Sequence, residues 1–128
     1  MIITKITHGI GNQLFQYALG RYLSLMNDTS LYFDLSYYKW TYESDTPRNF
    51  KLNNFQIDYK ILNSSPLIYL SKATKLFPNR TLKPFFILEK EKNFHFDHTI
   101  LNTRSNFLTL DGFWQSEKYF NSVSSAIR

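Results

Sequence analysis

The apolar residues of this chain divide its amino-terminal part into a strand, a helix and a second strand. Residues 1–6 form a short, β-branched run that is typical of a strand. Apolar residues at helical spacing follow, and Gln13 and Gln16 fall largely off their stripe, so we expect a helix packed on one face. The stripe comprises Leu14, Phe15, Ala18, Leu19, Tyr22, Leu23 and Met26. Residues 31–35 predict a second strand, parallel to the first because a helix connects them.

The loop between the first strand and the helix carries the main functional signal. Three of the four glycines lie within the first twenty residues, and two of them are in this loop. A helix N-terminus presents free N–H groups and the positive end of the helix dipole, which suit a phosphate or diphosphate. Glycine there allows a positive φ and a close approach of the ligand. We therefore expect ligand contacts at Gly9, Gly11, Asn12 and Gln13, with Asn12 as the helix cap.

Two known phosphate loops match this segment only in part. A dinucleotide fingerprint needs a third glycine where the chain has Leu14, although Asp34 lies at about the distance (roughly 20 residues) expected of a ribose-binding acid. A nucleotide-triphosphate loop needs Lys and Ser or Thr after its last glycine, and Asn12 and Gln13 occupy those positions. The alternative is that Gly9 and Gly11 only form a tight turn.

Four ordered stretches carry a family resemblance. Residues 8–18 read H-G-I-G-N-Q-L-F-Q-Y-A and are similar to G-G-L-G-N-Q-M-F-Q-Y-A. Residues 31–38 resemble the second strand of the same family, residues 48–55 its R-x-F-x-L-x-x-F stretch, and residues 112–120 its G-Y-W-Q-S-E-K-Y-F. The family is glycosyltransferase family 11, the bacterial α-1,2-fucosyltransferases. His8 replaces its first glycine and Leu14 its methionine.

The resemblance implies an α/β fold, namely the Rossmann-like, mostly parallel amino-terminal half of a GT-B glycosyltransferase with flanking helices. Residues 1–128 would form a single acceptor-side domain, and the carboxy-terminal, donor-binding half would be missing. Members of the family are about twice as long and carry a downstream H-x-R-R-x-D-Y motif that this chain lacks. Whether the chain alone is an enzyme therefore stays open, and we expect it to be inactive by itself.

The implied reaction is transfer of L-fucose from GDP-fucose to the 2-hydroxyl of a galactoside with inversion. It needs no metal ion or other cofactor. The implied partners are the sugar nucleotide, a glycan or lipid-linked acceptor, and the missing half-domain. Two alternatives remain: a truncated, non-catalytic homologue that serves as a binding or assembly module, and a divergent dinucleotide-binding oxidoreductase.

Further candidate residues lie near predicted strand ends, where open α/β sheets bind ligands. A transfer to a hydroxyl needs a general base, and His8, Asp34 and Asp111 are weak candidates for it. Residues 108–115 alternate like a buried strand that ends in a glycine-marked bend, after which Ser116 is expected to cap a helix. Substrate contacts are expected at the residues that follow the strands, with core packing as the alternative for the aromatic ones. They are Tyr38, Trp114 and Gln115.

Composition and charge narrow the functional class. The chain has no cysteine, no basic-apolar leader and no apolar run near the roughly 18 residues of a membrane span, so we expect a cytoplasmic protein. The net charge is +5. Lys72, Lys75, Arg80 and Lys83 make the densest basic stretch, which favours a solvated helix face, with peripheral contact to an anionic inner membrane as the alternative. No nucleic-acid signature accompanies the charge, so no such partner is expected.

A histidine-rich stretch, residues 95–98, is the one place that suggests a metal site. If it lies in a strand, His95 and Asp97 share a face and His98 points away. That arrangement leaves too few ligands on one side, and we expect no metal.

Overall fold

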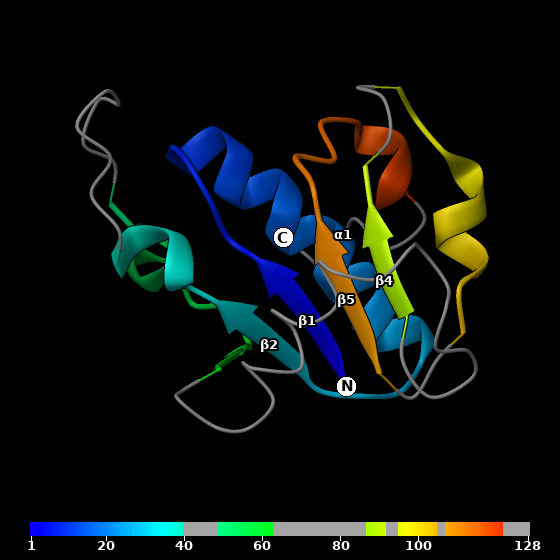
Figure 1. Cartoon of the computed structure of the whole chain (residues 1–128), viewed down its shortest axis with the longest axis horizontal. Coiled ribbons are helices and arrows are strands. Elements are labelled where there is room, and N and C mark those ends of the chain that lie inside the picture. The colour runs from blue at the N-terminus through cyan, green and yellow to red at the C-terminus, as the bar shows by residue number, and fades with distance from the viewer. Residues whose placement is uncertain (40–48, 63–86, 92–94, 105–106, 122–128) are drawn as a thin grey trace.

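A five-stranded parallel sheet with one long helix on its face forms the framework of the molecule (Figure 1). The computed structural model describes residues 1–39, 49–62, 87–91, 95–104 and 107–121. The strands are β1 (Ile2–Lys5), β2 (Leu31–Asp34), β3 (Lys60–Ile61), β4 (Ile87–Lys90) and β5 (Leu108–Asp111), and the helix is α1 (Ile10–Met26). Short 3-10 helices complete the described part: η1 (Ser36–Lys39), η2 (Leu52–Asn54), η4 (His98–Asn102) and η5 (Glu117–Tyr119).

The strand order is β3-β2-β1-β5-β4, and every pair is parallel. β1 is central: Ile2 pairs with Leu31 of β2 on one side and with Leu108 of β5 on the other. The predicted β-loop-α-β unit and its parallel pairing are confirmed, as is the strand before Gly112. The fold is therefore α/β and Rossmann-like, and the carboxyl ends of all strands meet at one edge of the sheet.

Helix α1 agrees with the predicted stripe in its middle and differs from it at its start. It begins at Ile10 with Gly9 as its N-cap, so the prediction that Asn12 caps the helix is wrong. The stripe residues Ala18, Leu19, Tyr22 and Leu23 are buried as predicted. In the first two turns Gln13 and Gln16 are fully buried instead of Leu14, which is 41% exposed, because their amides bond to the loops around the helix start.

Close packing between α1 and the sheet depends on Gly20. A Cβ atom at this position would overlap Oγ1 of Thr4 on β1 and lie 2.9 Å from Cδ1 of Leu31 on β2. The contact also shows that Thr4 faces α1. Since side chains alternate along a strand, Lys5 must face the opposite side of the sheet.

The core lies between α1 and the sheet and extends to the segments that follow β2 and β5. Phe33 of β2 stacks on Tyr59 at 4.4 Å between ring centroids. Trp114 and Tyr119 pack edge to face at 5.8 Å. Other buried members are Ile2, Ile6, Leu19, Leu23, Leu52, Ile100, Leu108 and Leu110.

The remaining local predictions have mixed outcomes. Ser116 accepts a hydrogen bond from the Lys118 N–H, as a cap should, but the helix that it begins in the described residues is the short η5. The strand expected around His95 is wrong: residues 95–97 are not in a strand, and Asp97 caps η4 instead. The basic stretch from Lys72 to Lys83 lies outside the described residues.

We predict that Gly20→Ala destabilises the protein by about 1–3 kcal/mol, because the added methyl group has no room between α1 and β1. Gly11→Ala on the same helix is the matched control, since a Cβ there meets nothing within 4 Å. Urea unfolding measures both changes. Equal stability of the two variants would show that the helix does not approach the sheet this closely.

Candidate functional site

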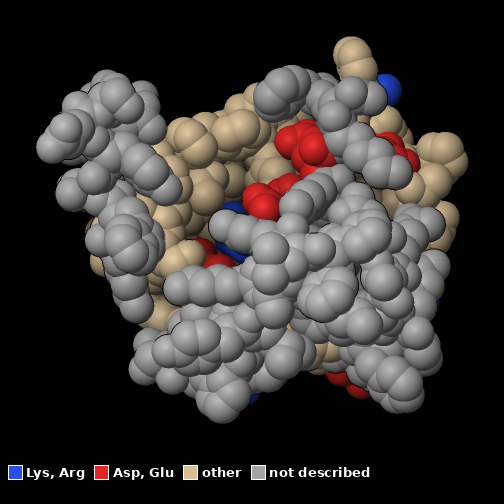
Figure 2. Space-filling model, in the orientation of Figure 1, with Lys and Arg blue, Asp and Glu red and all other residues tan. Residues whose placement is uncertain are grey.

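The carboxyl ends of the three central strands bring charged side chains together on the face of the sheet away from α1. Lys5 of β1 pairs in register with Asp34 of β2, and its Nζ lies 3.4 Å from Oδ2 of Asp111 on β5. Two of the three candidate bases are therefore at strand ends on either side of Lys5. Figure 2 shows a hollow in this face of the molecule, with basic atoms at its floor and acidic atoms around it.

The two carboxylates differ in their surroundings. Asp34 is buried, and its Oδ1 accepts a hydrogen bond of 2.9 Å from the Ser36 N–H, which starts η1. The Asp111 side chain is 35% exposed and forms the ion pair with Lys5. Asp111 is thus the more accessible of the two to a ligand at this edge.

The loop between β1 and α1 has a different backbone from the one that its glycines suggest. No described glycine has a positive φ, and Gly9 is extended with φ −84°. The left-handed residue is His8, with φ 62°. Histidine tolerates this region better than most residues with a side chain. The expectation that Gly9 and Gly11 supply a positive φ is therefore wrong.

Gly11 instead provides open space in the first turn of α1. It is exposed, and no atom lies within 4 Å of the place where a Cβ would be. The backbone N–H groups of the first turn, at Ile10, Gly11 and Asn12, have no carbonyl partner within the helix. They are the donors that an anion at the start of the helix would meet.

The side chain of Gln13 fixes the loop from within. It is fully buried, and its Nε2 donates to the carbonyl oxygens of His8 and Asn49, each at 2.9 Å. Its Oε1 accepts from the Lys51 N–H at 2.9 Å. Because the whole amide is used, the Gln13 side chain positions the site and is not free to contact a ligand.

Gln16 makes the corresponding connection to β5. Its Oε1 accepts from the Thr7 N–H at 2.9 Å, and its Nε2 donates to Thr7 Oγ1 at 2.8 Å and to the Gly112 carbonyl oxygen at 3.0 Å. The two glutamines thus join α1 to the loops that follow β1 and β5 and to residues 49–51. This role was not predicted; the available signal was a pair of amides one turn apart beside a glycine loop.

The His8 carbonyl oxygen accepts a second hydrogen bond, of 2.8 Å, from the Tyr38 hydroxyl. The pKa of Tyr38 is raised, mainly by burial and to a smaller extent by the neighbouring Tyr37 phenol. The Tyr38 hydroxyl therefore keeps the proton that it donates. Tyr38, expected to bind substrate, therefore holds the loop in this structure. The His8 ring stacks on Tyr37 at 4.8 Å.

The turn after β5 is held by Glu91. Its carboxylate accepts from the N–H groups of Phe113 at 2.8 Å and Trp114 at 3.3 Å. A Cβ at Gly112 would lie 2.5 Å from Cβ of Glu91, so this position requires glycine. Trp114 is left-handed, with φ 55°, and only 3% exposed. It is a core residue packed against Tyr119, which is the alternative to substrate contact that the sequence allowed.

Gln115 is the member of this turn that reaches the helix start. It is exposed, and its Nε2 donates to Oδ1 of Asn12. The structure thus brings together Asn12 and Gln115, two of the residues expected to contact ligands, from segments 103 residues apart.

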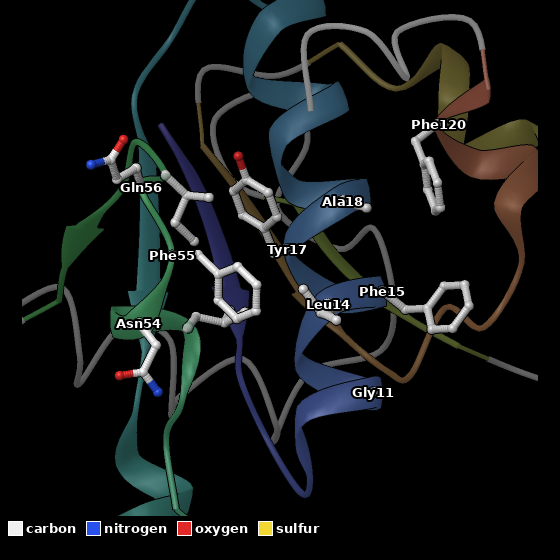
Figure 3. A pocket seen from close by; sticks show the side chains of 11 residues that line it. Gly11, Leu14, Phe15, Tyr17, Ala18, Asn54, Phe55, Gln56 and Phe120 are labelled. Carbon is white, nitrogen blue, oxygen red and sulfur yellow. The ribbon is translucent and has the colours of Figure 1, made fainter. Parts of the chain in front are cut away.

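An apolar groove with a volume of about 760 Å³ runs from Gly11 along the outer side of α1. In Figure 3, Leu14 of the helix and Phe55 of the segment after η2 face each other across it. Phe15 and Phe120 border its other side, 6.2 Å apart between ring centroids. The groove leads away from the polar strand ends.

The His, Asp and Glu residues in the described part of the chain include no group of three or more that could hold a metal ion. No helix in the same residues is both long and apolar enough to cross a membrane.

Together these residues define a Rossmann-like sheet with polar loops at its carboxyl edge. The chain is similar to an α-1,2-colitosyltransferase of Escherichia coli, with 27% identity over 136 residues. The alignment covers 100% of this chain and 43% of that protein, so the chain spans less than half the length of this relative. No family model matches the chain, and no solved structure matches it. The similarity supports a glycosyltransferase-like function.

We predict that Gln13→Leu lowers the free energy of unfolding by about 2–4 kcal/mol, because it removes the hydrogen bonds that this fully buried amide makes to the His8 and Asn49 carbonyls and to the Lys51 N–H. Gln56→Leu, at an exposed position, is the control and should change stability by less than about 0.5 kcal/mol. Urea unfolding gives both values. Amide hydrogen exchange should show faster exchange at Lys51 in the first variant, and unchanged exchange there would contradict the proposed link.

Proposed function

We propose that the chain is the amino-terminal, acceptor-side part of a GT-B glycosyltransferase that transfers L-fucose from GDP-fucose to the 2-hydroxyl of a galactoside. The observation that carries the proposal is the similarity to an α-1,2-colitosyltransferase along the full length of the chain. Colitose is a deoxy form of fucose, so the two donor sugars differ by one hydroxyl. The linkage in the relative's name is the one that we propose here.

In the proposed reaction an acceptor oxygen forms a bond to the anomeric carbon of the sugar from the side opposite the diphosphate. The bond from that carbon to the GDP oxygen breaks, and the acceptor proton passes to a base. Negative charge grows on the departing diphosphate. The free N–H groups of Gly11 and Asn12 would stabilise it as fixed dipoles, with no metal ion required.

The accessible carboxylate of Asp111 is our first candidate for the base, ahead of the buried Asp34. Its ion pair with Lys5 holds the carboxylate at the carboxyl end of β5. Glycan or lipid-linked acceptors would enter from this edge, in the cytoplasm or at the inner membrane surface. The donor half would come from a further domain, so we expect no transfer by residues 1–128 alone.

A non-catalytic binding or assembly module is the alternative that the sequence left open. The two proposals differ in one measurable respect. An assembly module would bind a partner without any need for open backbone at Gly11, whereas a transferase needs that space for the diphosphate.

We predict that Gly11→Ala lowers kcat/KM at least about tenfold in a chimera that joins this chain to the carboxy-terminal part of the E. coli relative. The methyl group obstructs the approach to the first-turn N–H groups, while the fold has room for it. Transfer from radiolabelled GDP-fucose and GDP-colitose to a galactoside measures the effect.

Leu25→Ala, at an exposed site near the other end of α1, is the control for a change on the same helix. Both variants should retain wild-type thermal stability, to within about 1 kcal/mol. Full activity of Gly11→Ala would remove the first turn of α1 from the mechanism.

We predict that Asn12→Ala in the same chimera lowers kcat more than it raises KM, by about a hundredfold if the side chain supports charge that develops in the transition state. Gln115→Ala is the matched variant, because it removes the same side-chain hydrogen bond from the other partner. Steady-state kinetics of both variants separates the roles. Equal effects would assign Asn12 to loop positioning alone.

A further inference from the structure

His8 is held in an unusual place for a histidine. Its backbone is left-handed, with φ 62°, and its carbonyl oxygen is fixed by Gln13 and Tyr38. Its ring stacks on Tyr37 at 4.8 Å with an interplanar angle of 29°, and meets the Phe113 ring edge to face at 4.8 Å. Contacts on two sides leave the imidazole little freedom to turn.

The two ring nitrogens of His8 have different environments. Nδ1 is buried and has no hydrogen-bond partner in the part of the chain that the structure describes. The whole residue is partly exposed, and Nε2 is not among the buried unpaired atoms, so Nε2 is the nitrogen that reaches the surface. Buried polar atoms without a partner are uncommon in proteins, which makes this one informative.

The burial of Nδ1 determines where the proton of the neutral ring resides. A buried N–H without an acceptor is less tolerable than a buried lone pair without a donor. In a neutral imidazole one nitrogen carries the proton and the other accepts. The proton therefore belongs on Nε2, and the nitrogen at the surface is a donor.

We infer that His8 is a ligand-binding residue that donates a hydrogen bond through Nε2 to an oxygen atom of the sugar nucleotide, and that it is not the general base. The inference rests on the function proposed above, which puts the diphosphate at the first turn of α1, next to this loop. A base would need a bare nitrogen at the surface. His8 presents the opposite arrangement.

The first arm of the test is a long-range ¹⁵N–¹H spectrum of the 128-residue chain without ligand. His95 and His98 are exposed and serve as internal references for rings that exchange between tautomers. We expect a single tautomer for His8, with the proton on Nε2. A proton on Nδ1, or the same averaging as in the two reference histidines, overturns the inference.

The second arm compares two substitutions, each of which places an amide nitrogen near the position of one of the two ring nitrogens. The amide nitrogen of His8→Gln reaches about as far as Nε2, whereas that of His8→Asn reaches about as far as Nδ1. Asparagine also tolerates the left-handed backbone well, so His8→Asn should fold at least as stably as His8→Gln. Any loss confined to the asparagine variant is thus not a loss of fold.

Because the donor half would come from a further domain, binding of GDP-fucose and of GDP is measured by calorimetry in chimeras that join the wild-type chain and each variant to the carboxy-terminal part of the E. coli relative. We expect His8→Gln to bind within about threefold of wild type and His8→Asn to bind about tenfold more weakly or worse, as loss of a hydrogen bond to a charged group implies. Equal binding by the two variants overturns the assignment of Nε2. If the folded wild-type chimera binds neither nucleotide, the proposed donor site at α1 and the ligand role of His8 are both contradicted, whereas a failed tautomer result alone leaves the donor site intact.

Discussion

Two buried glutamine amides hold the candidate site together. Gln13 and Gln16 lie one turn apart on α1, are fully buried, and use their amide groups on backbone atoms of three other segments. A buried amide without partners would cost about 1–3 kcal/mol for each unsatisfied group, so these bonds permit only one placement of the loops around the helix start. The backbone at residues 7–8, 49–51 and 112 is fixed by the same two side chains.

This constraint explains why the glycines have roles other than those expected in a phosphate-binding loop. Since Gln13 and Tyr38 both bind the His8 carbonyl, the sharp change of direction falls on His8, and Gly9 is left extended as the helix cap. Gly11 then leaves open space beside the first turn of α1, and Gly20 allows the helix to approach β1. Each of these glycines meets a spatial requirement, and none of the three has a positive φ.

The central part of the framework was predictable because it depends on local patterns, whereas β3 and β4 were not predicted. A β-branched run gave β1, an apolar and aromatic run gave β2, an apolar helical repeat gave α1, and the connecting helix implied parallel pairing. Burial in the first two turns of α1 was not predictable in this way. Apolar spacing favours Leu14 as a buried residue, yet it is 41% exposed, and Gln13 and Gln16 are buried instead because their amides bond to residues far along the chain.

The same limitation applied to the site. Glu91 binds the N–H groups of residues more than twenty positions away, and Asn12 meets Gln115 across most of the chain. Such contacts leave no periodic signal in a single sequence. The candidates at strand ends could be found because parallel strands end at one edge, but their individual roles depend on burial and partners that only the structure provides.

The arrangement at the strand ends also bears on the dinucleotide alternative. The absence of a third glycine is weak evidence against it, because Leu14, at that position, lies on the outer side of α1, where close packing against the sheet is not at issue. Asp34 is a stronger argument. A ribose-binding acid must offer both oxygens to a diol, whereas Asp34 is 4% exposed and its Oδ1 holds the Ser36 N–H that starts η1. Binding a ribose there would disrupt the turn after β2, so Asp34 does not fit the role of the ribose-binding acid that a dinucleotide site needs.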